Sequence, residues 1–342
     1  MTVIGWDIGG VNIKAARVNA NAPLAARNHP FEIQRAPATL AARLEGIATE
    51  LGAEKSDAHA ITMTAELSQF FRTKRDGVVY VLDAVERAFP QAQTLVYATD
   101  GRFLEPAAAR DSPLLVAASN WTATASLVAT LVSDAVLIDV GTTTTDIIPI
   151  CAGRVAAIGH TDPERLLSGE LLYLGAVRTP VEAIAQRVPL HDGLAGVSAE
   201  AFALAGDVHV WRGDLTPVGY TAPTPDGRPP TREFAGERIA RVVCADRELL
   251  DESDIDRIAA FIADTMIARI AASVARVRER HPHLETAVIA GHGAFLARSA
   301  ARRAGLRVAH DDLITGGAPR VAGAEAAFAV ARLLECRPNS IA

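Results

Sequence analysis

The sequence carries one short pattern twice. The first copy is Asp7-Ile-Gly-Gly-Val-Asn-Ile-Lys14, and the second is Asp139-Val-Gly-Thr-Thr-Thr-Thr-Asp146. Each copy follows an apolar run and precedes another, which is typical of a strand, a tight turn and a second strand. The repeat therefore predicts two related halves, each containing a hairpin with an acidic residue close to its turn.

Glycine beside a carboxylate suits the binding of phosphate together with a divalent cation. Glycine has no Cβ to keep a phosphate away from the backbone, so amide N–H groups can face an anion. Mg²⁺ is usually held by one or two carboxylates together with phosphate oxygens. Two such hairpins facing each other would form a clamp. The alternative is structural, because Asp-x-Gly also occurs in ordinary hairpin turns.

Length and composition indicate a globular protein of two lobes. The chain has 342 residues, of which 49% are hydrophobic and 22% charged, and domains of about 150 residues are the usual size. The net charge is −6 and the basic residues are scattered, which argues against binding nucleic acid or an anionic membrane surface. Three widely spaced cysteines and an N-terminus without a basic, apolar leader favour a reducing cytoplasm.

The uncharged stretch 112–133 is long enough to raise the question of a membrane span. It contains Pro113 and many hydroxyl side chains, so we expect a buried strand over 114–118 followed by a packed helix over about 121–132. No membrane association is expected.

Strands and helices alternate along the chain, which indicates mixed sheets covered by helices. We predict helices over 37–51, 83–89, 176–187 and 255–280, and strands over 60–64, 94–98 and 286–290. The apolar stripe of the 255–280 helix, behind a Ser253-x-x-Asp256 cap, is expected to be core. The N-terminal lobe is placed at 1–133, with a last helix at about 321–335 packing back on it. The C-terminal lobe is placed at 134–320, with an insertion at about 188–235.

Several loops are also candidates for a site. The Pro- and Gly-rich segment 216–232 is predicted to be a loop, either merely exposed or a lid. The turn Gly291-His292-Gly293 follows a strand and opens a helix, which lets backbone approach a ligand closely. Gly316-Gly317-Ala318-Pro319 precedes the last helix in the same way, and His310-Asp311-Asp312 is either a turn cap or a metal site.

At this point the sequence resembles a known superfamily. Two Asp-x-Gly hairpins and a late glycine turn are similar to the two phosphate segments and the adenosine segment of the sugar kinase, actin and heat-shock chaperone (ASKHA) superfamily. The resemblance implies an α/β fold of two lobes, each with a ribonuclease-H-like mixed sheet flanked by helices, in a duplicated actin-like arrangement.

More closely, four segments resemble the hydantoinase A/oxoprolinase-related branch: 4–14, 118–121, 138–146 and 168–180. Within it the chain is most similar to tetrahydromethanopterin-linked one-carbon transfer proteins and to the archaeal furan-methanamine synthases of methanofuran biosynthesis. That resemblance implies a transferase. An aminomethyl-furanmethanol diphosphate would lose diphosphate while the phenol of a tyramine- or tyrosine-derived acceptor attacks the furfuryl carbon.

The resemblance also implies roles for individual residues. Asp7 and Asp139 would hold Mg²⁺, and Asp146 or Glu170 would deprotonate the phenol. The residues expected to bind substrate or phosphate are Gly9, Gly10, Asn12, Lys14, Gly141, Thr142, Thr143, Thr144, Arg178, Gly291, His292 and Gly293.

One departure from the superfamily pattern concerns nucleotide binding. His292 stands where the kinases usually carry a small residue, which argues against ATP and for a non-nucleotide diphosphate. Two alternatives stay open: an ATP-dependent kinase or cyclic-amide hydrolase, and a non-catalytic nucleotide-binding regulator. The expected partners are a small-molecule diphosphate and a phenolic acceptor. The oligomeric state, including a homodimer, also stays open.

Overall fold

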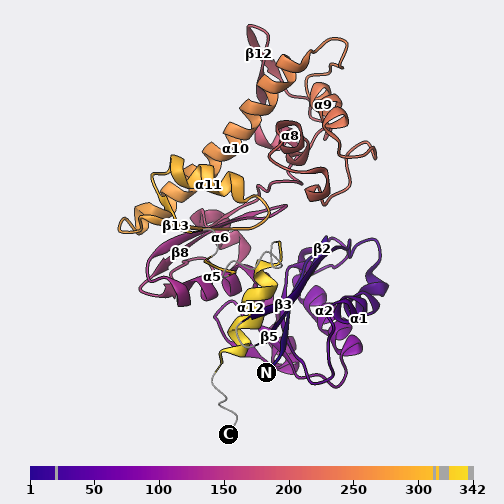
Figure 1. Ribbon diagram of the computed structural model, residues 1–342, viewed down its shortest axis with the longest axis vertical. Coiled ribbons are helices and arrows are strands. Elements are labelled where there is room, and N and C mark those ends of the chain that lie inside the picture. The colour runs from indigo at the N-terminus through magenta and orange to yellow at the C-terminus, as the bar shows by residue number, and fades with distance from the viewer. Residues whose placement is uncertain (20–21, 311–312, 316–322, 338–342) are drawn as a thin grey trace. The chain divides into compact units, whose positions relative to one another are not determined.

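The computed structural model describes residues 1–19, 22–310, 313–315 and 323–337 (Figure 1). The chain divides into two compact units. The first unit comprises Met1–Ala135, Ile150–Glu164 and His310–Ala342, and the second comprises Val136–Pro149 and Arg165–Ala309. The sequence-based division was 1–133 together with the last helix, and 134–320, whereas here Ile150–Glu164 also belongs to the first unit.

The first unit is built on a six-stranded mixed sheet with the order β3-β2-β1-β4-β5-β6. Strands β1, β2 and β3 are antiparallel neighbours, whereas β4 and β5 continue the sheet parallel to β1. The strands are β1 (Val3–Ile8), β2 (Asn12–Asn19), β3 (Ala22–Pro30), β4 (Ala58–Met63), β5 (Thr94–Tyr97) and β6 (Phe103–Leu104).

The second sheet has the order β10-β8-β7-β13-β14, with β9 paired to β8. In this sheet β10 pairs antiparallel with β8, whereas β13 runs parallel to both β7 and β14. The strands are β7 (Ala135–Val140), β8 (Thr145–Cys151), β9 (Arg154–Val155), β10 (Leu171–Leu172), β13 (Thr286–Ala290) and β14 (Arg307–Val308). The order 3-2-1-4-5 thus occurs twice, and the predicted duplicated ribonuclease-H-like fold is confirmed.

Alternation along β1 sends its side chains to two different layers. Ile4, Trp6 and Ile8 belong to the core formed with helices α1 and α2, so Gly5 and Asp7 face the opposite side of the sheet. That side is covered by α12 (Figure 1). A Cβ on Gly5 would overlap the carbonyl oxygen of Ala327 in α12, so glycine at this position lets the helix lie directly on β1. The helices of this unit are η1 (Pro37–Thr39), α1 (Leu40–Glu50), η2 (Ala65–Leu67), α2 (Lys74–Ala88), α3 (Pro106–Asp111), α4 (Pro113–Val116), α5 (Asn120–Leu131) and α12 (Glu325–Glu335).

The predicted strand over 114–118 is wrong, because this segment begins with the short helix α4. Proline at the first helical position favours that conformation, and only Ala117 pairs with a strand residue, Met63. The helix expected after it is present as α5.

The helix predicted over 176–187 is also wrong. Only α7 (Val181–Ile184) is helical, starting directly after Pro180, and the chain then forms the hairpin β11 (Arg187–Leu190) and β12 (Gly193–Gly196). Proline lacks an N–H and cannot sit inside a helix without breaking it. The remaining helices are α6 (Asp162–Ser168), α8 (Ala205–Arg212), η3 (Pro217–Gly219), α9 (Arg232–Arg241), α10 (Glu252–Arg280) and α11 (Ala294–Arg303).

Helix α10 is the predicted long amphipathic helix, and its N-terminal cap differs from the expected one. Asp251 accepts from the backbone of Asp254, and Asp254 accepts from the backbone of Asp251. Within the described residues α10 is the one helix long and apolar enough to cross a membrane. Most of its apolar side chains are buried, and it packs against α8 and α11, so core packing accounts for its apolar stripe.

Candidate functional site

The first hairpin closes through a single backbone hydrogen bond. Gly9 N donates to Asn12 O at 2.9 Å, and this turn aligns Asp7 on β1 with Lys14 on β2. Lys14 Nζ lies 3.1 Å from Asp7 Oδ2. Asp7 is 3% exposed, and its Oδ1 has no hydrogen-bond partner among the described residues. One carboxylate oxygen is therefore held by a cation while the other is left to bind something else.

The second hairpin reproduces this turn and is covered by a following loop. Gly141 N donates to Thr144 O at 2.8 Å, and the backbone N–H groups of Ala176 and Arg178 donate to the oxygens of Gly141 and Thr142. Arg178 is half-buried, and no carboxylate pairs with its guanidinium in the part of the chain that the structure describes. It is thus a cation available beside the second turn.

Gly291 and Gly293 pack against the end of β7. Gly291 has φ +85°, and a Cβ there would overlap Asp139 Oδ1. Gly293 N donates to Val140 O at 2.7 Å. Both glycines are therefore required by the close approach of this turn to the strand that carries Asp139. Their presence alone does not call for a ligand.

His292 connects this turn to the Pro- and Gly-rich loop 216–232. Its Nε2 donates to Gly219 O at 2.7 Å, because a carbonyl oxygen only accepts. The loop predicted as exposed or a lid thus contacts the glycine turn through one defined hydrogen bond.

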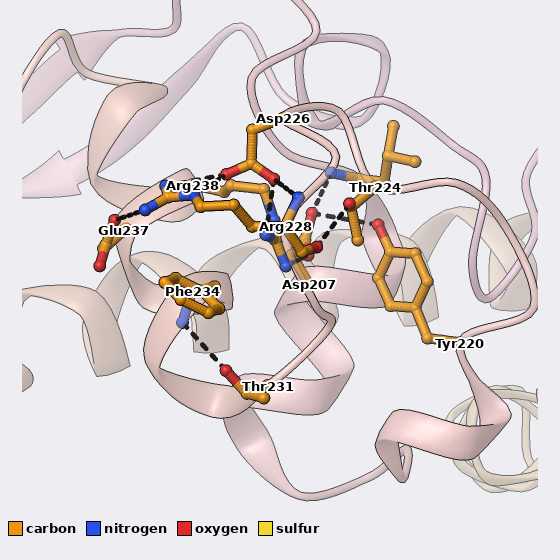
Figure 2. Close-up of polar contacts among 10 residues, drawn as sticks. Asp207, Tyr220, Thr224, Asp226, Arg228, Thr231, Phe234, Glu237 and Arg238 are labelled. Atoms are coloured by element: carbon orange, nitrogen blue, oxygen red, sulfur yellow. Dashed lines mark hydrogen bonds and ion pairs between the residues drawn. The ribbon is translucent and has the colours of Figure 1, made fainter.

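Ion pairs also tie the loop to helices α8 and α9 (Figure 2). Arg238 on α9 is 1% exposed and binds Asp207 on α8 at 2.8 Å and Asp226 in the loop at 3.0 Å. The Tyr220 hydroxyl donates to Asp207 at 3.3 Å, and Arg228 pairs with both Asp226 and Glu237. Burial raises the pKa values of Asp207 and of Tyr220 above their usual ranges. The loop is therefore anchored by a buried network.

The two predicted bases of the second unit both carry arginine partners. Arg165 Nη2 lies 2.6 Å from Asp146 Oδ1, and Arg280 Nη2 lies 3.0 Å from Glu170 Oε1. Glu170 is fully buried. These contacts give both carboxylates a structural role, joining β8, α6 and α10.

A buried acid that sequence reasoning missed lies in the first unit. Glu66 in η2 is 2% exposed, and neither of its carboxyl oxygens has a hydrogen-bond partner among the described residues. Burial raises its pKa to about 7, although the Lys74 ammonium and nearby backbone amides act in the opposite direction. The sequence feature that could have identified Glu66 is its position just after a buried strand, at the edge of the sheet where parallel-sheet proteins bind ligands.

The geometry of Asp7 fits a magnesium ligand. A buried carboxylate oxygen without a partner is costly unless a ligand satisfies it, and Mg²⁺ binds few protein carboxylates when phosphate supplies further oxygens. No group of three or more His, Cys, Asp or Glu side chains suited to a metal occurs within the described ranges.

Of the other loop candidates, 311–312 and 316–319 lie outside the described residues.

Comparisons with known proteins agree with the fold. The sequence profile described as hydantoinase/oxoprolinase matches residues 57–332. The chain belongs to the hydantoinase/oxoprolinase family. A curated relative from Methanocaldococcus jannaschii, the (4-{4-[2-(gamma-L-glutamylamino)ethyl]phenoxymethyl}furan-2-yl)methanamine synthase, is 34% identical over 300 residues, 87% of this chain and 88% of the relative. A relative of the same name from Methanococcus vannielii is 36% identical over 165 residues, 48% of this chain and 73% of the relative.

Among solved structures, a nucleotide-free acetone carboxylase resembles this family member with a TM-score of 0.64 and 11% identity. The match covers 97% of this chain and 70% of that one. This similarity supports the architecture alone.

Proposed function

We propose that this protein is a transferase that joins a furanmethyl carbon to a phenol oxygen with release of diphosphate, in the biosynthesis of a methanofuran-type cofactor. The observation that carries the proposal is the 34% identity to a synthase named for a phenoxymethylfuran amine, extending over 88% of that relative. Both proposed substrates are small molecules, because the product for which that synthase is named is itself a small molecule.

The proposed reaction is a substitution at the furanmethyl carbon. The bond from this carbon to the diphosphate oxygen breaks, a bond to the phenol oxygen forms, and the phenol proton passes to a base. The furan ring delocalises positive charge that develops on the carbon. The departing diphosphate needs cations and hydrogen-bond donors to take up its negative charge.

Residues from both hairpins supply these groups in the proposal. Lys14 and Arg178 are the cations beside the two turns. The backbone N–H groups of the Gly9-Gly10 and Gly141-Thr142-Thr143 turns that do not close the hairpins would donate hydrogen bonds to phosphate oxygens. In the first unit Asp7 would be a ligand of Mg²⁺ through its unpartnered Oδ1, and in the second unit Asp139 is proposed as a metal ligand beside its own turn. When bound there, Mg²⁺ would neutralise the leaving group and lower the barrier to its departure.

The deciding experiment combines the purified protein with Mg²⁺, an aminomethyl-furanmethanol diphosphate and gamma-glutamyl-tyramine. We expect mass spectrometry to detect the phenoxymethylfuran ether, with one diphosphate released for each ether formed. A parallel reaction contains ATP. Ether formation that requires ATP, or hydrolysis of ATP coupled to another substrate such as a cyclic amide, would contradict the proposal and favour the ATP-dependent alternative.

A further inference from the structure

Glu66 lies at the edge of the first sheet that also carries the first hairpin turn. Strands β1 and β4 are parallel, with Ile8 opposite Met63, so their carboxyl ends meet. Thr64 N donates to Ile8 O at 3.0 Å. A Cβ built on Gly10 would lie 4.0 Å from the Cα of Ala65. Helix η2, with Glu66, thus follows directly beside the predicted phosphate turn.

Helix α2 packs closely against the backbone of Glu66. A Cβ on Gly77 would lie 2.5 Å from the Glu66 Cα and 2.8 Å from its carbonyl oxygen. Glycine at position 77 therefore allows α2 to press against η2. On the neighbouring segment, Ala118 has φ +52°, a conformation that costs energy for a residue other than glycine and often occurs at functional sites.

Several other polar atoms of this unit are buried without partners. They lie on the hairpin and on the first turn of α5, and Ala117, just before α5, pairs with Met63 beside η2. The atoms are Asp7 Oδ1, Asn12 Oδ1, Ser119 Oγ and Thr122 Oγ1. Buried polar groups normally have partners. Several orphans on the elements around one sheet edge therefore point to a polar ligand that supplies the missing hydrogen bonds.

We propose that Glu66 is the catalytic base that accepts the phenol proton. This inference rests on the proposed function, and the proton balance is simple. The phenol O–H bond breaks, its electron pair forms the new bond to the furanmethyl carbon, and the proton moves to a Glu66 carboxyl oxygen. Among the described residues no cation forms an ion pair with the Glu66 carboxylate, unlike Asp146 and Glu170, whose oxygens bind arginine.

The charges around Glu66 agree with this role. Lys74 Nζ pairs with Asp162 at 2.6 Å. The Lys74 ammonium lowers the pKa of Glu66, whereas the Asp162 carboxylate raises it. Burial dominates and raises the pKa of Glu66 to about 7. A base with a pKa near neutrality is better matched to a phenol, with its pKa near 10, than an ordinary glutamate.

The test compares E66Q with a matched control at the other end of the same strand. Asp57 precedes β4, is as buried as Glu66, and is fully paired with Arg17. E66Q keeps the shape of the side chain but does not accept the proton. We expect kcat for ether formation to fall by about 100-fold to 10,000-fold, with a melting temperature no lower than that of the wild type. D57N should lower the melting temperature and leave kcat of the folded protein within about threefold of wild type.

A second readout separates a base from a residue that merely shapes the site. Ring-fluorinated tyramine acceptors have more acidic phenols and need a base less. We expect E66Q to recover activity as the acceptor becomes more acidic, while the wild-type rate changes little. An equal loss with every acceptor, or a kcat of E66Q within about threefold of wild type, would overturn the inference and leave the proposed function intact. No ether with wild-type protein would overturn both.

Discussion

Lys14 Nζ lies 3.1 Å from Asp7 Oδ2, and the two residues are register partners on adjacent antiparallel strands. Opposed positions in a hairpin project to the same face of the sheet. Here the pairing holds one oxygen of Asp7, while the other stays buried without a partner among the described residues. Lys14 therefore both orients the acid and places a positive charge beside the turn.

Asp7→Asn is expected to lower kcat/KM for ether formation by about 100-fold or more, because an amide is a poor ligand for Mg²⁺. Lys14 is 30% exposed, so losing the ion pair should cost only about 1 kcal/mol of stability. The measurement is the initial rate as a function of Mg²⁺ concentration, with thermal melting alongside. The Mg²⁺ concentration for half-maximal rate should rise. An unchanged Mg²⁺ dependence would show that Asp7 is not a ligand.

Gly291→Ala tests whether the glycine turn holds Asp139 in place. The new methyl group would overlap Asp139 Oδ1 and lie 2.5 Å from Val140 O, so Asp139 must move. Gly305→Ala is the matched control, since Gly305 has φ +75° but open space around its Cβ position. Both variants should lose about 1 kcal/mol from left-handed strain. Only G291A should lose activity, by at least about tenfold, in rate assays at saturating Mg²⁺. Equal activity of the two variants would show that Gly291 is not needed to hold Asp139 in place.

The repeated pattern predicted two related halves with one hairpin each, and the resemblance to the ASKHA superfamily supplied the ribonuclease-H-like fold. Apolar runs on both sides of each Asp-x-Gly turn specify two hairpins, and the observed strand orders follow from placing one β-α unit after another on each hairpin. The failures are local. Pro113 and Pro180 determine whether short apolar segments become helices, and both segments were assigned from periodicity without enough weight on proline.

The candidate site was less predictable than the fold. Asp7 and Lys14 could be predicted as site residues from the sequence. Each lies two residues from the end of the Gly9–Asn12 turn, which places them opposite each other on the two strands. Glu66 belongs to no motif, and its significance depends on burial and on the absence of a partner, which are tertiary properties. Conversely, Asp146 and Glu170 looked reactive in sequence, and their arginine partners, Arg165 and Arg280, only become visible in the folded chain.

The pH dependence of stability should contain two opposing contributions from the first unit. Burial raises the pKa of Glu66 from 4.5 to about 7, so this group lowers stability as the pH rises from about 4.5 to 7. Burial lowers the pKa of His59 from 6.5 to about 4, so stability falls as the pH drops through that window. Each contribution amounts to about 3 kcal/mol. In the wild type they largely offset one another between about pH 4.5 and 6.5.

Single substitutions should reveal each contribution in urea unfolding between pH 4 and 8. E66Q should become more stable relative to wild type as the pH rises. His59→Gln, which keeps an acceptor for Trp6 Nε1, should become more stable relative to wild type as the pH falls below about 6. The difference in unfolding free energy between a variant and the wild type at each pH removes the contributions of the other titrating groups, which the two proteins share. Parallel curves for all three proteins would contradict both pKa shifts.

The network around Arg238 should determine whether the 216–232 loop stays in place. Arg238→Met leaves Asp207 buried without its cation, and removing one member of a buried pair costs about 3–5 kcal/mol. Since Asp207 relieves this cost by taking up a proton, the destabilisation should be smaller at pH 5 than at pH 8. Arg228→Met is the control, because Arg228 is 37% exposed and its loss should cost about 1 kcal/mol. Limited proteolysis should cleave the loop faster in R238M than in R228M. Equal cleavage rates would mean that Arg238 does not anchor the loop.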